Sequence, residues 1–236
     1  YFLVPEIPSR AIKMLDDIGM LNEILPELKN TQNVSQPKQY HDKDVYGHTL
    51  DVLDKIKPDL LLRVTALLHD IGKPLTRTEI DGKISFISHE KKGAETAKNI
   101  LLGLKYPVDF IKQVCFLIEN HMYPKNYENV WKDSAVRKFA YGMGDNLLNI
   151  EQLYFADCGK IQNKNDLFDR VKNLREQNLL VKHEELFDGN ELMKIFNKSQ
   201  GQWIGQAKKY IRDMQFEEPQ ITKNEALNKL KKLLKI

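Results

Sequence analysis

Apolar residues recur every three to four positions along almost the whole chain, a spacing typical of amphipathic helices. Asp44 and Ser9 each stand just ahead of such a run, and both residue types favour helix N-caps. Pro58 suits the first turn of a helix whose apolar face ends near Leu68, with Gly72 just beyond it. Further helices are expected at residues 89–102, 107–120, 133–141, 146–158, 164–176, 189–196, 203–214 and 224–235. The pattern predicts a mainly α fold.

One segment breaks the helical pattern. Residues 76–80 and 83–87 are short runs of β-favouring residues, and Asp81-Gly82 between them is a strong signal for a two-residue hairpin turn. We therefore expect a helical bundle with one small β-hairpin and a helical C-terminal tail.

The composition excludes several classes of protein. The 236 residues are 42% hydrophobic and 29% charged with two Cys, which argues against collagen, a low-complexity disordered chain or a disulfide scaffold. The longest uncharged apolar runs, such as residues 64–68, are too short to cross a membrane. The few Cys and the lack of a recognisable secretion signal favour the cytoplasm. The chain starts with Tyr1 rather than Met, which leaves an additional upstream domain open.

Three segments are expected along the chain. The polar stretch 30–39 separates a helical entry segment, residues 1–38, from the main body, residues 39–180. A second change near residues 181–189 begins a helical tail, residues 181–236. From residue 201 to 236 eight Lys/Arg stand against four Asp/Glu, whereas the whole chain has a net charge of only +3. The excess positive charge therefore lies in the tail.

The pair His69-Asp70 follows a strongly apolar helix, where two adjacent polar residues are costly unless something satisfies them. A divalent cation would do so, because imidazole and carboxylate are both good ligands for transition metals. A hydrogen-bonded cap at the helix end is the alternative, and for an isolated pair it is the simpler interpretation.

Other candidates lie at helix ends or on apolar helix faces. Any one of them alone would be interpreted as structural. As a set they occupy the places where ligands converge inside a helical bundle. These candidates are His48, His89, His121 and Asp157.

The order His48 … His69-Asp70 … Asp157 resembles the HD phosphohydrolase superfamily, whose signature is H…HD…D on an all-helical core. His89 and His121 resemble the two additional histidines of members that hold two metals, and the stretches His-Asp-Ile-Gly-Lys-Pro at 69–74 and His-Glu-Lys-Lys-Gly-Ala at 89–94 are also similar. The resemblance implies a first metal site at His48, His69, Asp70 and Asp157. It implies a second site at His89 and His121, bridged by Asp70. By the same analogy, Lys73 would contact a substrate phosphate or the attacking water.

The flanks resemble the HD domain and tail of bacterial tRNA nucleotidyltransferases and poly(A) polymerases. The similar stretches are residues 15–28, 188–205 and 224–227. The catalytic head of that family needs a Gly-Ser turn followed by Asp-x-Asp on a strand. Asp42-Lys43-Asp44 lacks the Gly-Ser and stands where a helix begins, so we interpret it as helix capping. This chain is therefore not expected to add nucleotides, and a head domain would have to lie elsewhere.

The predicted chemistry is metal-assisted phosphoester hydrolysis with Asp70 and Lys73 as catalytic residues. The His-rich set favours one or two ions of Mn, Fe, Ni or Zn over Mg. The resemblance implies nucleotides or RNA 2′,3′-cyclic phosphate ends as substrates, with Lys73 as a substrate-binding residue. Lys92 is a further candidate for substrate binding, because Lys92 and Lys125 lie around the site and could meet a phosphate. Lys92 and the nearby Lys125 could equally form a solvated basic surface.

An RNA-binding module is the alternative function, with tRNA as its partner. The tail lysines could contact an RNA backbone and Trp203 could stack on a base, with affinity that falls as salt rises. The same lysines could instead be solvated while Leu227 and Leu230 bury the opposite face of the last helix.

Overall fold

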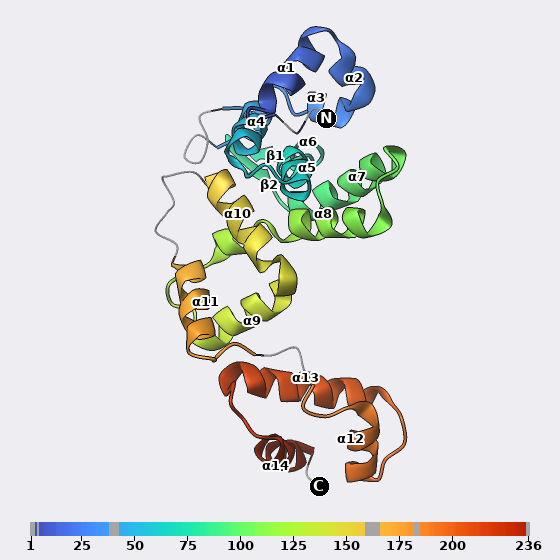
Figure 1. The fold of residues 1–236 in the computed structure, drawn as a ribbon, viewed down its shortest axis with the longest axis vertical. Coiled ribbons are helices and arrows are strands. Elements are labelled where there is room, and N and C mark those ends of the chain that lie inside the picture. The colour runs from blue at the N-terminus through green and yellow to red at the C-terminus, as the bar shows by residue number, and fades with distance from the viewer. Residues whose placement is uncertain (1–2, 4, 38–42, 159–165, 182–184, 235–236) are drawn as a thin grey trace. The chain divides into compact units, whose positions relative to one another are not determined.

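The computed structural model describes residues 3, 5–37, 43–158, 166–181 and 185–234. Within these ranges the chain is mainly helical with one two-stranded antiparallel hairpin, which confirms the predicted fold class. The chain divides into two compact units (Figure 1). The first comprises Tyr1–Asn126 and Asn146–Lys164, and the second comprises Tyr127–Asp145 and Asn165–Ile236. The predicted segment boundaries near residues 38 and 180 stay predictions.

The first unit contains most of the predicted helical body and the hairpin. Its helices are α1 (Ser9–Asp17), α2 (Met20–Ile24), α3 (Pro26–Lys29), α4 (Val45–Lys55), α5 (Leu60–Leu68), α6 (Lys73–Thr76), α7 (His89–Gly103), α8 (Val108–Asn120) and α10 (Leu147–Cys158). Short 3₁₀ turns are formed at Pro124–Asn126 in this unit and at Gly144–Asn146, where the two units meet in the sequence.

Local side-chain chemistry sets several helix starts. The Asp44 side chain accepts a hydrogen bond from Gly47 N at 2.8 Å and caps α4, as predicted. Asp59 caps α5 through Leu62 N, so this helix begins two residues after Pro58. Ser9 lies inside the first turn of α1 rather than at its N-cap.

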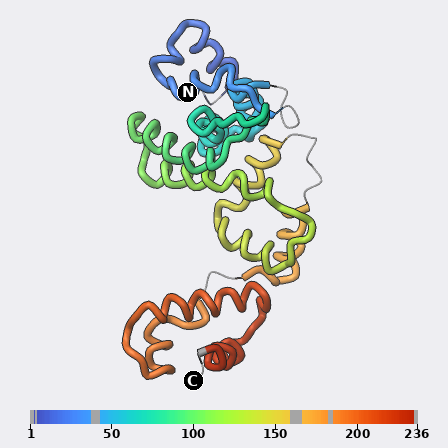
Figure 2. The backbone as a smooth tube through the Cα atoms, turned by 180° about the vertical axis from the view of Figure 1, so that it is seen from behind, coloured from blue at the N-terminus to red at the C-terminus, as the bar shows by residue number. Residues whose placement is uncertain are grey.

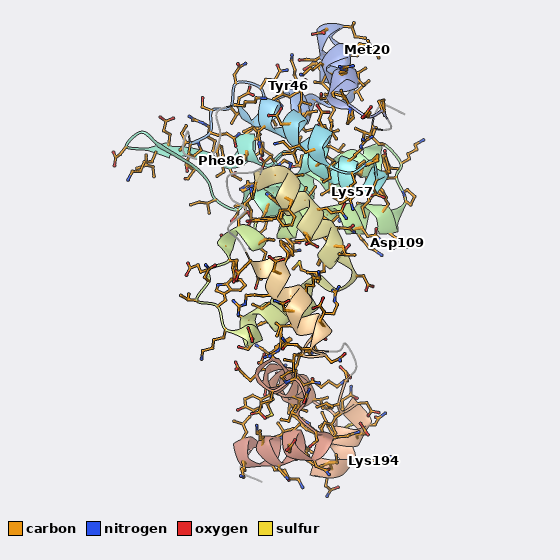
Figure 3. The ribbon with its side chains drawn as sticks, turned by 60° about the vertical axis from the view of Figure 1, so that its left-hand side comes forward. Met20, Tyr46, Lys57, Phe86, Asp109 and Lys194 are labelled. Atoms are coloured by element: carbon orange, nitrogen blue, oxygen red, sulfur yellow. The ribbon has the colours of Figure 1, made fainter. Side chains whose placement is uncertain are left out.

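The hairpin pairs β1 (Arg77–Ile80) with β2 (Lys83–Phe86) in the register Ile80↔Lys83. Asp81 and Gly82 both have positive φ, 51° and 71°, which is the backbone of the two-residue turn that their sequence predicts. Figure 3 shows the hairpin extending away from the helices. Ser88, with φ 62°, then turns the chain abruptly into α7, so that His89 is the first residue of that helix.

The core of the first unit is formed around α5, whose Val64, Ala66 and Leu68 are buried. This helix packs against α4 and α8, and α7 lies along α8 (Figure 2). Helix α10 returns to the same core with Leu153 and Ala156 and contacts α4, α5 and α8. These contacts bring helices that are far apart in the sequence around one interior.

The second unit has its own core. Its helices are α9 (Asp133–Met143), α11 (Leu167–Glu176), α12 (Gly189–Phe196), α13 (Gln202–Glu217) and α14 (Lys223–Leu234). Leu192, Ile211 and Leu230, one from each of α12, α13 and α14, are fully or almost fully buried together. Among the described residues, no helix has both the length and the apolar character needed to span a membrane.

Candidate metal centre

The six predicted ligands lie in five helices of the first unit or directly after their ends, and all six are buried. His48 lies in the middle of α4, and Asp157 lies one residue before the end of α10. His69 and His121 are the C-cap residues of α5 and α8, while His89 begins α7. Helix ends therefore deliver most of the set, because a side chain at a terminus can point along the helix axis into the space between helices.

The structure brings the six residues together as two triads, and in each the candidate ligand atoms lie within 4.8 Å of one another. His48, His69 and Asp157 form the first triad, with His48 Nε2 2.9 Å from Asp157 Oδ1 and His69 Nε2 3.9 Å from the same oxygen. Asp70, His89 and His121 form the second.

The Asp70 carboxylate lies between the two triads. Its Oδ2 is 3.2 Å from His69 Nε2 and 3.8 Å from His48 Nε2. Its Oδ1 is 3.5 Å from His89 Nε2 and 3.9 Å from His121 Nε2. One carboxylate thus presents one oxygen to each triad, which is the arrangement that a bridging ligand requires.

Three imidazoles are each oriented by a backbone carbonyl three residues earlier in the chain. His69 Nδ1 lies 2.8 Å from Ala66 O, His89 Nδ1 2.8 Å from Phe86 O, and His121 Nδ1 2.6 Å from Ile118 O. Because a carbonyl oxygen can only accept, we assign a proton to each Nδ1. Metal-ligating histidines commonly donate their other ring N–H in this way, since the bond fixes the tautomer and leaves Nε2 for the ion.

The buried Nε2 atoms of three histidines indicate whether a divalent cation fits between the side chains. His89 Nε2 and His121 Nε2 lie 3.4 Å apart. If both rings are neutral, two lone pairs face each other, and neither nitrogen can donate to the other. His69 Nε2 is also buried without a partner in hydrogen-bonding geometry. A cation that accepts these lone pairs removes the repulsion, so the residues present fit a divalent ion.

The electrostatics favour neutral imidazoles at His89 and His121 beside ionised carboxylates. Burial lowers the pKa of His89, and it lowers the pKa of His121 to about 3 with help from the positive charges near that ring. Burial opposes ionisation of Asp70, but His69 and Lys73 outweigh it and hold the pKa of that carboxyl well below its usual range. The same balance holds for Asp157, where Lys125 and His48 lower the pKa. The two carboxylates raise the pKa of His69 above its ordinary value despite its burial, so a proton and a metal ion compete for that ring.

His121 gives a pH prediction for metal-free protein. Its pKa is 6.5 in an unfolded chain and about 3 in the fold, so between these values only the unfolded state binds the proton. Stability should therefore fall as the pH falls through this window, by roughly 1.4 kcal/mol per unit from this group. In His121→Leu the contribution is absent. From pH 6.5 to 5 the wild type should lose roughly 2 kcal/mol relative to the variant in chelator-treated urea unfolding. Parallel pH profiles would contradict the assignment.

The two predicted lysines lie in different settings. Lys73 is buried, and its Nζ donates to Asp70 Oδ2 and to Gln36 Oε1, both at 2.7 Å. Lys92 is exposed on α7, where its Nζ lies 2.7 Å from Glu95 Oε2. Lys73 therefore lies at the candidate metal centre, while contact between Lys92 and a substrate stays a prediction.

A cavity of about 410 Å³ opens beside the triads. Its polar wall includes Lys73, Lys125, Ser85 and Asn126, and its apolar wall includes Phe86, Met122 and Pro37. His89 and Asp157 also line it, so both triads contribute a residue. The cavity is large enough for a small organic phosphate and is lined by both positive and apolar groups.

Sequence reasoning missed two side chains of this centre. Gln36 comes from the polar stretch before α4, and nothing in its sequence context indicates contact with Lys73. Lys125 was named only among nearby basic residues, yet its Nζ lies 2.5 Å from Asp157 Oδ2. Its position four residues after His121 is the signal that could have found it, because the 3₁₀ turn at Pro124–Asn126 directs the chain back toward the site.

Two of the curated relatives are tRNA nucleotidyltransferases by name, and a third is a multifunctional CCA protein. The A-adding tRNA nucleotidyltransferase of Deinococcus radiodurans is 30% identical over 214 residues, which cover 84% of this chain and 48% of that protein. The CC-adding tRNA nucleotidyltransferase of Thermus thermophilus is 29% identical over 228 residues, covering 92% of this chain and 51% of that protein. A multifunctional CCA protein of Janthinobacterium is 40% identical over 106 residues, covering 43% of this chain and 25% of that protein. The chain spans about half the length of the first two relatives.

The family comparison covers the residues that form the centre. Residues 41–163 match the model of the HD domain, and this range contains all six candidate ligands together with Lys73 and Lys125. The resemblance to the HD part of tRNA nucleotidyltransferases is thereby confirmed. The chain belongs to the HD-domain family.

Proposed function

We propose that the chain is a metal-dependent phosphohydrolase acting on nucleotides or on RNA ends that carry a 2′,3′-cyclic phosphate. The observation that carries the proposal is the position of Asp70, with one carboxylate oxygen directed to each buried triad. A structural His-Asp cap would not need a second group of two histidines on the far side of the same carboxylate.

The buried His and Asp residues would bind the metal ions, and Lys73 would contribute a positive charge. His48, His69, Asp157 and Asp70 would hold one ion, and His89 and His121 would hold a second together with Asp70. An ion bound there lowers the pKa of water and neutralises charge on phosphate oxygens. Lys73 Nζ, at the cavity wall and 2.7 Å from Asp70, adds a fixed positive charge beside the phosphate.

The cavity supports a nucleotide-like substrate. Two lysine ammonium groups favour a phosphate, and Phe86 and Met122 offer apolar surface for a base or sugar. Lys92 would meet a longer substrate only after leaving Glu95. Four imidazoles among six ligands favour Mn, Fe, Ni or Zn over Mg, which prefers oxygen ligands.

The proposal is tested by metal analysis and by assay. Protein purified without chelators should contain up to two transition-metal ions per chain. It should hydrolyse bis-p-nitrophenyl phosphate or 2′,3′-cyclic AMP when supplied with Mn, Ni, Co or Fe. Absence of hydrolysis with all four metals and with Mg would contradict the proposal.

RNA binding is a second candidate, supported by the names of the relatives and by alignments that reach into the basic tail. On this proposal tRNA would be the partner, and a nucleotidyltransferase domain would lie outside this chain. Asp44 supports the expectation that this chain does not add nucleotides by itself. Its two oxygens accept from Gly47 N and Asn33 N, as a helix cap does.

Several positive charges of the tail are already paired with carboxylates, so fewer lysines are available to RNA than the net charge suggests. Lys208, Lys223 and Lys229 lie within 2.7 Å of carboxylate oxygens on Glu185, Glu191 and Glu218. The Trp203 indole donates to Ser199 O, and its ring packs on Phe196. A filter-binding titration with tRNA should show affinity that falls as salt rises. Absence of binding at low salt, or affinity that ignores salt, would remove this candidate.

A further inference from the structure

Asp70 and Asp157 each contact the ammonium group of a lysine as well as the histidines of the triads. Lys73 Nζ is 2.7 Å from Asp70 Oδ2, and Lys125 Nζ is 2.5 Å from Asp157 Oδ2. The Lys73 position was anticipated from the sequence, but the Lys125 contact was not. Lys125 therefore needs an explanation of its own.

Asp157 is shared between two kinds of partner. Its Oδ1 lies 2.9 Å from His48 Nε2, inside the first triad, while its Oδ2 holds Lys125. A divalent ion placed among His48, His69 and Asp157 would meet the Lys125 ammonium across one carboxylate group. Two positive charges that close repel each other strongly where little water screens them. The ammonium and the ion therefore compete for Asp157.

When a divalent ion binds Asp157, the cavity offers the Lys125 side chain an alternative position. Its backbone is held by hydrogen bonds from Lys125 N to Met122 O and from Asn126 N to Tyr123 O, so the turn that carries it is fixed. Its side chain lines the 410 Å³ cavity and keeps 19% of its surface exposed. Rotation of the side chain alone can move the ammonium from Asp157 into the cavity.

We propose that Lys125 is an exchangeable cation of the first triad. It occupies Asp157 while the triad is without metal, yields the carboxylate to a divalent ion, and then presents its ammonium to an anionic phosphate in the cavity. This inference rests on the proposed function, because it needs the triad to bind metal. It adds an order of events: the metal enters first, and the phosphate site is completed by that entry.

The test is a Co²⁺ titration of chelator-treated protein followed by absorbance, with Lys125→Met as the main variant. Removing the competing ammonium should tighten Co²⁺ binding by about fivefold or more. Lys125→Arg keeps the charge and should bind Co²⁺ as the wild type does. Lys112→Met is the matched control, because Lys112 forms an exposed ion pair on α8 with Asp109, whose Oδ1 lies 3.0 Å from Lys112 Nζ. This substitution should leave the Co²⁺ affinity unchanged. Should the Met variant fold poorly by circular dichroism, Lys125→Gln takes its place.

A second measurement follows the released ammonium. With saturating Co²⁺, inorganic phosphate should bind Lys125→Met about tenfold more weakly than it binds the wild type. Unchanged or weaker Co²⁺ affinity in the Met and Gln variants would overturn the inference, as would tighter binding in Lys125→Arg or unchanged phosphate affinity. Failure of the wild type itself to bind Co²⁺ would remove the proposed function together with the inference.

Discussion

Asp70→Ala is expected to lower hydrolysis of bis-p-nitrophenyl phosphate by about a hundredfold to a thousandfold and to reduce the bound metal. Asp70 reaches both triads, so its loss takes a negatively charged ligand from each ion site at once. It also leaves Lys73 buried with Gln36 as its remaining polar contact, which costs about 3–5 kcal/mol of stability. Activity and metal content should be measured on the same preparation.

Two companion variants separate chemistry from folding. Asp70→Asn keeps the volume and an oxygen that accepts from Lys73, so it should fold better than Asp70→Ala while still losing metal and activity. Asp109→Ala removes an exposed carboxylate on α8, on the opposite side of the first unit from Phe86 (Figure 3). It should behave as the wild type. Full metal content and activity in both Asp70 variants would refute the role of this residue.

Gly72→Ala is expected to destabilise the first unit by about 3 kcal/mol and to halve the metal content. A Cβ at this position would lie 2.3 Å from His89 O and 2.6 Å from Gly93 N. Both are backbone atoms of α7, so the clash cannot be relieved by rotating a side chain. The start of α7 would have to move away from Gly72 and would carry His89 away from Asp70. In the wild type His89 Nε2 lies 3.5 Å from Asp70 Oδ1. The second triad should therefore be lost, while His48, His69 and Asp157 can still bind one ion.

Gly103→Ala is the matched control for this change. Gly103 ends the same helix, and a Cβ there meets nothing within 4 Å. The substitution should leave metal content unchanged and raise the unfolding free energy by about 0.5 kcal/mol. Unfolding curves and metal analysis on both variants compare the two sites directly. Equal effects at Gly72 and Gly103 would show that close packing at Gly72 does not hold α7 in place.

Local chemistry explains which parts of the fold could be predicted. Asp44 caps α4 and Asp81-Gly82 forms the hairpin turn because each depends on neighbours within a few residues. Ser9 behaves differently. Its amide and hydroxyl donate to the Asp54 carboxylate at 2.9 and 2.5 Å, a contact with α4 that no local pattern contains. A distant acceptor thus replaced the capping role that the sequence suggested.

The candidate site shows the same division. The order of His and Asp residues, together with their resemblance to a known signature, was enough to name the six residues that the structure gathers. It could not show which Asp70 oxygen faces which triad. It also could not show that Gln36 contacts the Lys73 ammonium or that Lys125 contacts the Asp157 carboxylate. Gly72 was interpreted only as a helix stop. Its close approach to α7 depends on tertiary packing, which sequence periodicity does not describe.

The interleaved connectivity of the two units has a consequence for synthesis on the ribosome. The first unit needs α10, which supplies Asp157 and closes the core with Leu153, yet residues 127–145 of the second unit are made before it. A nascent chain ending near residue 126 already carries the other five ligands, but the hydrogen bond that joins His48 to Asp157 spans 109 residues. Maturation of the centre must therefore wait until part of the second unit has emerged, and premature termination before α10 yields an open, incomplete cluster of histidines.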